Sequence, residues 1–261
     1  MPNETAGQFL TVDGVRLFAR WWRAPQPGKP VLVFMHDGLG STASLRALPE
    51  RLADACGLSA FGYDRWGYGR SDALPGLPAG LMEDEAGRLP RVLAAAGIDD
   101  YFVVGHSNGG TIALIHAASN PSGLRAAVSM SAHVKRDEVA VRALAHFTAY
   151  LDPGPIPEWL VRFQGDPQRA ERLVREWVAL WRNYFDIGWD LTPLLKEIRI
   201  PLMALHGDYD DYGAIDQLSA IHSAVPAARC AVLPRVAHFP HLDDLDGVVE
   251  RIAGFLNPYV G

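Results

Sequence analysis

Cysteine is scarce in this sequence, and basic residues do not outnumber acidic ones. The two cysteines, Cys56 and Cys230, stand far apart and lack the short spacing of a metal-binding pair. This argues against a disulfide-stapled domain and against a cysteine-ligated metal, and two free thiols are typical of a reducing compartment. Lysine and arginine number 24 against 30 aspartates and glutamates. The resulting net charge of −6 argues against a nucleic-acid partner and against attraction to an anionic membrane.

Long apolar runs are also missing. No stretch approaches the ~18 consecutive apolar residues that a membrane helix needs. The N-terminal residues lack the basic-then-apolar pattern of a secretory signal. We therefore expect a cytoplasmic protein with no membrane partner. The composition, 49% hydrophobic and 21% charged, is ordinary for a globular enzyme with a large core.

The apolar runs that are present are short and alternate with amphipathic segments. Six segments are predicted to be strands: residues 31–35, 58–63, 101–104, 124–130, 201–206 and 229–233. The unbroken apolar run 31–35 is typical of a strand that is buried on both faces. Two more strands, 8–12 and 15–22, flank the turn Asp13-Gly14. Helical patterns cover 44–55, 81–96, 111–119, 214–224 and 245–256. This alternation predicts an α/β fold with a doubly wound, mainly parallel sheet of eight strands.

The alternation is interrupted between residues 132 and 198, where no convincing strand occurs. Helical patterns at 137–151 and 166–185, with a proline-rich connector at 152–157, predict a helical cap inserted after the sixth strand. The predicted domains are a core, residues 1–131 and 199–261, and a cap, residues 132–198. Four of the seven tryptophans lie in this cap: Trp159, Trp177, Trp181 and Trp189. They either form the cap's own core or line a pocket beneath it.

One strand-to-helix turn carries the pattern G-x-S-x-G, as Gly105-His106-Ser107-Asn108-Gly109. Such a tight turn strains the backbone of its central residue and requires small neighbours two positions before and after it. It would present the Ser107 hydroxyl at the positive end of a helix, which suits a nucleophile whose attack generates an oxyanion. Taken alone, the pattern is equally compatible with an ordinary glycine-rich connection.

A serine nucleophile needs a base, and a histidine base needs a carboxylate to orient it. In a doubly wound sheet these groups come from loops at the carboxyl ends of strands. The candidates on such loops after Ser107 are three acids and two histidines: Asp208, Asp210, Asp211, His238 and His241. The chain order serine, acid, histidine is the one that this architecture uses.

Taken together, these motifs resemble those of the α/β-hydrolase family over nearly the whole chain. The family's loop patterns H-G-x-x-G and D-x-x-G-x-G-x-S are matched by residues 36–40 and 64–71, with Asp37 in place of a glycine. The resemblance implies that Asp210 is the acid, three residues after the glycine of H-G-x-x-D. It implies that His238 is the base, where Ala237 replaces the glycine of G-H-F. Asp208, Asp211 and His241 remain the alternatives.

The resemblance also implies two backbone donors for the oxyanion, the N–H groups of Asn108 and Gly38. A carboxylate beside a developing oxyanion is unfavourable, so we expect the Asp37 side chain to point away from it. Three further histidines are expected to be structural or to pack beside the turn: His36, His106 and His206.

The predicted activity is that of a serine hydrolase that cleaves a small, largely apolar carboxylic ester through an acyl-enzyme. No metal or organic cofactor is predicted, and a small-molecule substrate is the predicted partner. The same triad supports hydrolysis of a carbon–carbon bond in a diketone, a lactone, a thioester or an amide. A ligand-binding protein that keeps the fold without turnover is the non-enzymatic alternative. The sequence indicates no oligomeric state.

Overall fold

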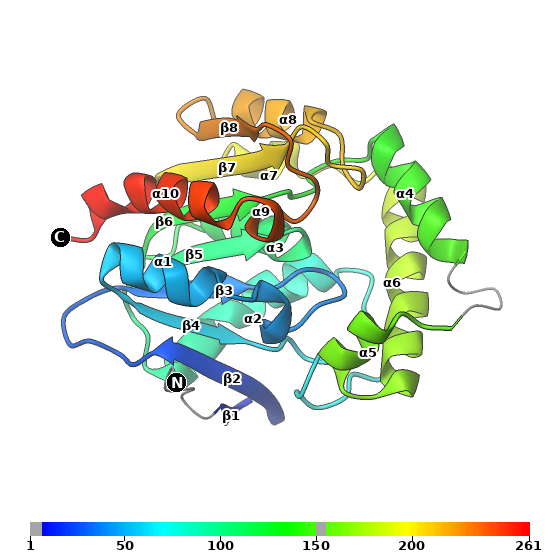
Figure 1. The fold of residues 1–261 in the computed structure, drawn as a ribbon, viewed down its shortest axis with the longest axis horizontal. Helices are drawn as coiled ribbons and strands as arrows, with labels where there is room; N and C mark the ends of the chain where they lie inside the picture. Colours follow the sequence, from blue (N-terminus) through cyan, green and yellow to red (C-terminus); the bar gives the residue numbers. More distant parts are fainter. Residues whose placement is uncertain (1–6, 150–154) are drawn as a thin grey trace.

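The computed structural model describes residues 7–149 and 155–261 and contains one sheet in the strand order β1-β2-β4-β3-β5-β6-β7-β8 (Figure 1). The strands are β1 Gln8–Val12, β2 Val15–Arg23, β3 Val31–Met35, β4 Ser59–Tyr63, β5 Tyr101–His106, β6 Leu124–Met130, β7 Leu202–Gly207 and β8 Arg229–Leu233. Strands β1, β2 and β4 pair antiparallel, and all neighbours from β4 to β8 pair parallel. The predicted eight-stranded, mainly parallel sheet is therefore confirmed.

Helices cover both faces of the sheet because successive strand side chains point to opposite faces. Leu32 and Phe34 of β3 belong to the core beneath α1 and α10, whereas Val33 and Met35 belong to the core beneath α2, α3 and α8. The covering helices are α1 Leu48–Cys56, α2 Leu81–Ala96, α3 Asn108–Ala118, α8 Asp216–Ala224 and α10 Leu245–Leu256. Two of them end at a left-handed glycine: Gly57 after α1 and Gly97 after α2.

The helix expected over 44–55 is divided. A short 3-10 turn, η1 Thr42–Leu45, precedes α1, and Arg46 between them has a φ of 52°. Pro49 lacks an N–H and fits only the first turn of a helix, so α1 begins at Leu48 rather than continuing from residue 44. The expected 111–119 helix begins earlier, at Asn108, directly after Ser107.

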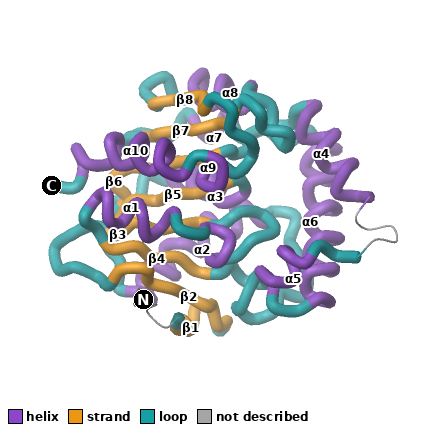
Figure 2. Tube along the Cα trace, viewed as in Figure 1, coloured by secondary structure: helices purple, strands orange, loops and turns teal. Residues whose placement is uncertain are grey.

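Helices α4 Glu138–Ala149, α5 Glu158–Gln164, α6 Pro167–Asp186 and α7 Thr192–Leu195 lie between β6 and β7. Helix α6 begins where Asp166 accepts hydrogen bonds from the N–H groups of Gln168 and Arg169. Helices α4, α5 and α6 stand to one side of the sheet, and loops occupy the region between them and the strands (Figures 1 and 2). Residues 150–154, which include parts of the expected helix 137–151 and of the connector, lie outside the described chain.

Candidate active site

Ser107 lies between β5 and α3 with φ 54° and ψ −121°, a conformation that costs free energy for any residue other than glycine. The surrounding backbone requires both flanking glycines. A Cβ on Gly105 would lie 2.1 Å from the carbonyl oxygen of Gly109, and one on Gly109 would lie 2.2 Å from that of Met35. The turn is as tight as the pattern predicts, and it places Ser107 at the first turn of α3.

Ser107, His238 and Asp210 form a hydrogen-bonded chain. The Oγ atom of Ser107 lies 3.0 Å from Nε2 of His238, and Nδ1 of His238 lies 2.9 and 3.0 Å from the two carboxylate oxygens of Asp210. Because Asp210 accepts the Nδ1 proton, Nε2 carries the lone pair that can accept the serine proton. Both Ser107 and His238 are buried, at 6% and 4% exposed.

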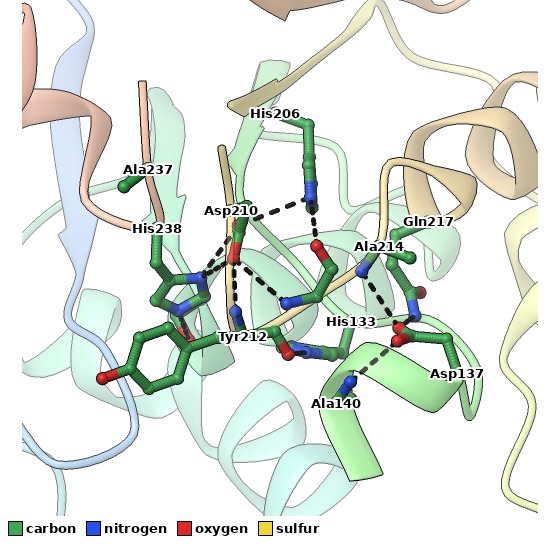
Figure 3. Close-up of polar contacts among 12 residues, drawn as sticks. His133, Asp137, Ala140, His206, Asp210, Tyr212, Ala214, Gln217, Ala237 and His238 are labelled. Carbon is green, nitrogen blue, oxygen red and sulfur yellow. Dashed lines mark hydrogen bonds and ion pairs between the residues drawn. The ribbon is translucent and has the colours of Figure 1, made fainter. Parts of the chain in front are cut away.

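Other groups besides His238 contact the Asp210 carboxylate (Figure 3). Its Oδ1 accepts hydrogen bonds from the N–H groups of Tyr212 and Gly213, and Nε2 of His206 lies 3.4 Å from its Oδ2. Burial alone would raise the pKa of Asp210, but His238, His206 and the Tyr212 N–H together lower it below the usual range of a carboxyl. The carboxylate therefore remains charged beside His238.

Residues that precede α4 brace the Asp210 loop. His133 donates through Nε2 to the carbonyl oxygen of Tyr212 at 2.8 Å, and Asp137 accepts from the N–H of Ala214 and from the side chain of Gln217 (Figure 3). Sequence reasoning did not single out His133. The feature that could have identified His133 is its position three residues after β6, because loops at the carboxyl ends of strands supply the site residues in such a sheet.

The peptide group between Asp37 and Gly38 is held through its carbonyl oxygen, and Gly38 lines the cavity beside Ser107. The carbonyl oxygen of Asp37 accepts hydrogen bonds from Nη2 of Arg65 at 2.8 Å and from Nδ1 of His36 at 2.9 Å. In a trans peptide the C=O and the following N–H point in opposite directions, so this clamp fixes the Gly38 N–H. Asn108 is the first residue of α3, and its N–H has no acceptor within the helix.

The Asp37 side chain is occupied within its own loop. Its Oδ2 accepts from the Ser44 hydroxyl at 2.6 Å and its Oδ1 from the Leu39 N–H at 3.1 Å. Burial alone would raise the pKa of Asp37, but His106, the Ser44 hydroxyl, His36 and the Leu39 N–H together lower it. The carboxylate thus braces the loop that contains Gly38.

Asp37→Asn should lower the free energy of unfolding near neutral pH by about 2 kcal/mol, because hydrogen bonds to a buried charge are lost. The folded-state pKa of Asp37 lies below its unfolded value of about 4. Its contribution is therefore present above about pH 4 and is lost as the pH falls. The difference in free energy of unfolding between the wild type and the variant, measured by urea unfolding, should be smaller at about pH 3 than at about pH 7. A deficit that stays constant would contradict this account, and the exposed Asp99→Asn serves as the control.

Comparison with known proteins identifies the family of this fold. Residues 30–176, more than half of the chain, match the family model described as the alpha/beta hydrolase fold. The chain belongs to the α/β-hydrolase family. It is 27% identical over 255 residues to the 2-succinyl-6-hydroxy-2,4-cyclohexadiene-1-carboxylate synthase of Escherichia coli O1:K1 / APEC, covering 88% of this chain and 95% of that one.

A second relative of this hydrolase is the proline iminopeptidase of Heyndrickxia coagulans, 23% identical over 291 residues that cover 95% of this chain and 98% of the relative. The solved structure of the 2-hydroxy-6-oxo-6-phenylhexa-2,4-dienoate hydrolase of Rhodococcus sp. strain RHA1 superimposes with a TM-score of 0.78. That superposition covers 96% of this chain and 98% of that chain at 17% identity, so it shows the fold alone.

Two further histidines, His106 and His241, lie near His238 but do not contact Ser107 in its place. Nε2 of His241 lies 3.1 Å from the carbonyl oxygen of Ser44, and Nε2 of His106 lies 2.7 Å from the carbonyl oxygen of His238. Burial is the main cause that lowers the pKa of His106, to about 3, and it also lowers that of His241. Both rings are therefore neutral at physiological pH, and they pack against each other 4.9 Å apart.

Two neighbouring cavities meet at Ser107, His238, Trp177 and Tyr212. The larger lobe, of about 290 Å³, has further lining residues that are mostly apolar: Asp37, Gly38, Leu39, Arg46, Phe147, Trp159, Phe163, Phe239 and Leu242. The smaller lobe, of about 30 Å³, is further lined by Asn108, His133, Ala140, Ala143, Leu144, Trp181 and Phe185.

The four tryptophans that the sequence placed in the predicted cap have different positions. Trp159 lines the larger lobe, Trp181 the smaller one, and Trp177 lines both. Trp189 is not among the described residues that line either lobe. Its ring stacks on Tyr184, 5.0 Å away, and meets Trp181 edge-on.

Within residues 7–149 and 155–261 no group of three or more potential ligands could hold a metal ion, and no helix is long and apolar enough to span a membrane.

Cys56 and Cys230 are free, and burial raises the pKa of Cys56 to about 11. At neutral pH its thiol is therefore protonated and a poor nucleophile.

Proposed function

We propose that this hydrolase cleaves a small, largely apolar carboxylic ester with Ser107 as nucleophile, His238 as general base and Asp210 as the acid that orients His238. The observation that carries the proposal is the 3.0 Å contact between Ser107 Oγ and His238 Nε2, with Asp210 on the opposite ring nitrogen. The largely apolar lining of the larger lobe favours an apolar group on the substrate.

In the acylation step, Ser107 Oγ forms a bond to the carbonyl carbon while its proton moves to His238 Nε2. The carbonyl π electrons move to the oxygen, which accepts hydrogen bonds from the N–H groups of Gly38 and Asn108. The electrons then return, the bond to the leaving alcohol breaks, and that alcohol takes the proton from Nε2. A water molecule repeats the sequence on the acyl-enzyme and releases the acid, returning the proton to Ser107.

Residues 132–198 act in this proposal as a cap that separates the site from bulk water. Trp177 of α6 and Phe147 of α4 line the cavity beside Ser107 and pack with their rings 5.1 Å apart. Gln164 of α5 is buried and donates to the carbonyl oxygens of Leu39 and Gly40. These contacts tie α5 to the loop that contains Gly38.

A fluorophosphonate probe should label Ser107 in the folded protein, because the base-activated hydroxyl attacks phosphorus and the oxyanion donors hold the phosphonyl oxygen. Intact mass and peptide mapping after treatment check the adduct. Urea-unfolded protein should remain unlabelled, and so should Ser107→Ala. An adduct at another serine, or none at all, would overturn the nucleophile assignment. A matched p-nitrophenyl butyrate and butyryl p-nitroanilide pair then distinguishes ester from amide hydrolysis.

A further inference from the structure

The smaller lobe contains polar side chains that the mechanism above does not use. Its polar lining, apart from the triad residues and Tyr212, consists of Asn108, His133, Trp177 and Trp181. Five atoms of these four side chains are buried and have no hydrogen-bond partner among the described residues: Nδ2 and Oδ1 of Asn108, Nδ1 of His133, Nε1 of Trp177 and Nε1 of Trp181. Buried polar atoms are rarely left unpaired, because desolvation without a partner is costly. Their gathering around one cavity points to a ligand group that pairs with them.

The four side chains are close to one another. A Cβ built on Gly38 would lie 2.4 Å from Nε1 of Trp177 and 2.8 Å from Nδ2 of Asn108, so these two groups meet over the loop that supplies an oxyanion donor. The rings of His133 and Trp181 have centroids 5.0 Å apart, and those of Trp177 and Trp181 are 6.1 Å apart. All four side chains line the smaller lobe, which Ser107 and His238 also line.

The chemistry of these atoms restricts what they can bind. His133 donates through Nε2 to the carbonyl oxygen of Tyr212, so its Nδ1 is a lone pair that accepts a hydrogen bond. Burial and the nearby His238 lower the pKa of His133, which keeps the ring neutral. The indole nitrogens of Trp177 and Trp181 can only donate. The lobe thus combines an acceptor with donors, and a hydroxyl, which donates once and accepts up to twice, pairs with both kinds.

We propose that the smaller lobe binds a hydroxyl group carried on the acyl chain, on the first or second carbon beyond the scissile carbonyl, so that the substrate is a hydroxyacyl ester. This proposal rests on the proposed ester hydrolysis and deepens it. A cavity of about 30 Å³ has room for one or two groups the size of a water molecule, which suits a hydroxyl on a short acyl chain. The larger, mostly apolar lobe then receives the alcohol portion.

Three benzyl esters test the proposal: benzyl butyrate, benzyl 2-hydroxybutyrate and benzyl 3-hydroxybutyrate. The readout is kcat/KM for release of benzyl alcohol, divided by the rate of alkaline hydrolysis of each ester to remove intrinsic reactivity. One of the hydroxylated esters should exceed benzyl butyrate by about 10²-fold or more, because a site built to pair with a hydroxyl is left unpaired by the analogue that lacks it. Equal values would mean that the lobe holds only resident water, and would overturn the proposal.

Two variants test whether the smaller lobe is the origin of the preference for a hydroxylated ester. Trp181→Phe removes an N–H while keeping an aromatic ring, and His133→Gln replaces the acceptor nitrogen. Each should reduce the ratio of kcat/KM for the preferred hydroxylated ester to kcat/KM for benzyl butyrate by about 10-fold or more. Because this ratio compares two esters on the same variant, a general loss of activity from a disturbed Asp210 loop cancels in it. Trp189→Phe is the matched control, since its indole N–H is also buried and unpaired but Trp189 is not among the described residues that line either lobe.

The outcomes separate this inference from the function on which it rests. Absence of a fluorophosphonate adduct at Ser107 would overturn the proposed hydrolysis itself. An adduct at Ser107 together with no preference for either hydroxylated ester, or with no cleavage of either, would overturn the hydroxyl site alone. A preference that survives unchanged in both Trp181→Phe and His133→Gln would also overturn it. Thermal unfolding of each variant checks that the fold is retained.

Discussion

Ser107→Ala should lower kcat for p-nitrophenyl butyrate by about 10⁵-fold or more, because no other group can form the acyl-enzyme. The loss should appear in kcat rather than in KM, since the serine hydroxyl contributes little to the cavity that holds the ester. The residual rate should reflect only the N–H groups of Gly38 and Asn108 and the binding of substrate. Steady-state kinetics with an enzyme preparation free of contaminating esterases measures it.

His238→Ala should cost a similar factor, and the double variant should cost no more than either single one. The two residues act in a single proton transfer. Once one of them is removed that transfer is already lost, so removing the other lowers kcat no further. If the two losses multiplied in the double variant, Ser107 and His238 would not act as one unit. Ser223→Ala, on the exposed surface of α8, is the control and should retain full activity.

The turn at Ser107 could be predicted from sequence because its requirements are local. A strand followed at once by a helix leaves no room for side chains at positions 105 and 109, and both are glycine in the chain. The strands were likewise predictable, because a run such as residues 31–35 has to be apolar when both of its faces are covered. The spacing of Asp210 from Gly207 is also local, and the structure places this acid next to His238.

The composition of the cavity could not be predicted in the same way. Trp177 and Trp181 recur at helical spacing in α6, and Trp189 follows that helix. Helical spacing cannot distinguish a tryptophan that packs inside the helical insertion from one that faces Ser107. The structure separates them through tertiary packing, since Trp189 stacks on Tyr184 while Trp177 reaches Gly38. The smaller lobe combines residues from the loop after β6, from the start of α3, and from α4 and α6, and no sequence pattern connects those segments.

Asp210→Asn should lower kcat by about 10⁴-fold while leaving the fold intact. The amide oxygen can still accept from the N–H groups of Tyr212 and Gly213, which are bonded to the Oδ1 position. The amide nitrogen would then take the Oδ2 position and donate toward Nδ1 of His238. The ring would have to carry its proton on Nε2 instead, so it could no longer accept the proton of Ser107. The aspartate thus sets which ring nitrogen is basic, in addition to stabilising the cation formed during the reaction.

Asp211→Asn and Asp208→Asn separate this role from a general effect of charge. Asp211 is exposed, and Asp208 accepts a hydrogen bond from the N–H of Arg235 rather than from His238. Both variants should keep kcat within about threefold of the wild type. If Asp208→Asn lost activity and Asp210→Asn retained it, Asp208 rather than Asp210 would be the acid that orients His238. Fluorophosphonate labelling adds a further readout, because a ring with its proton on Nε2 activates Ser107 poorly, so labelling of Asp210→Asn should slow together with kcat.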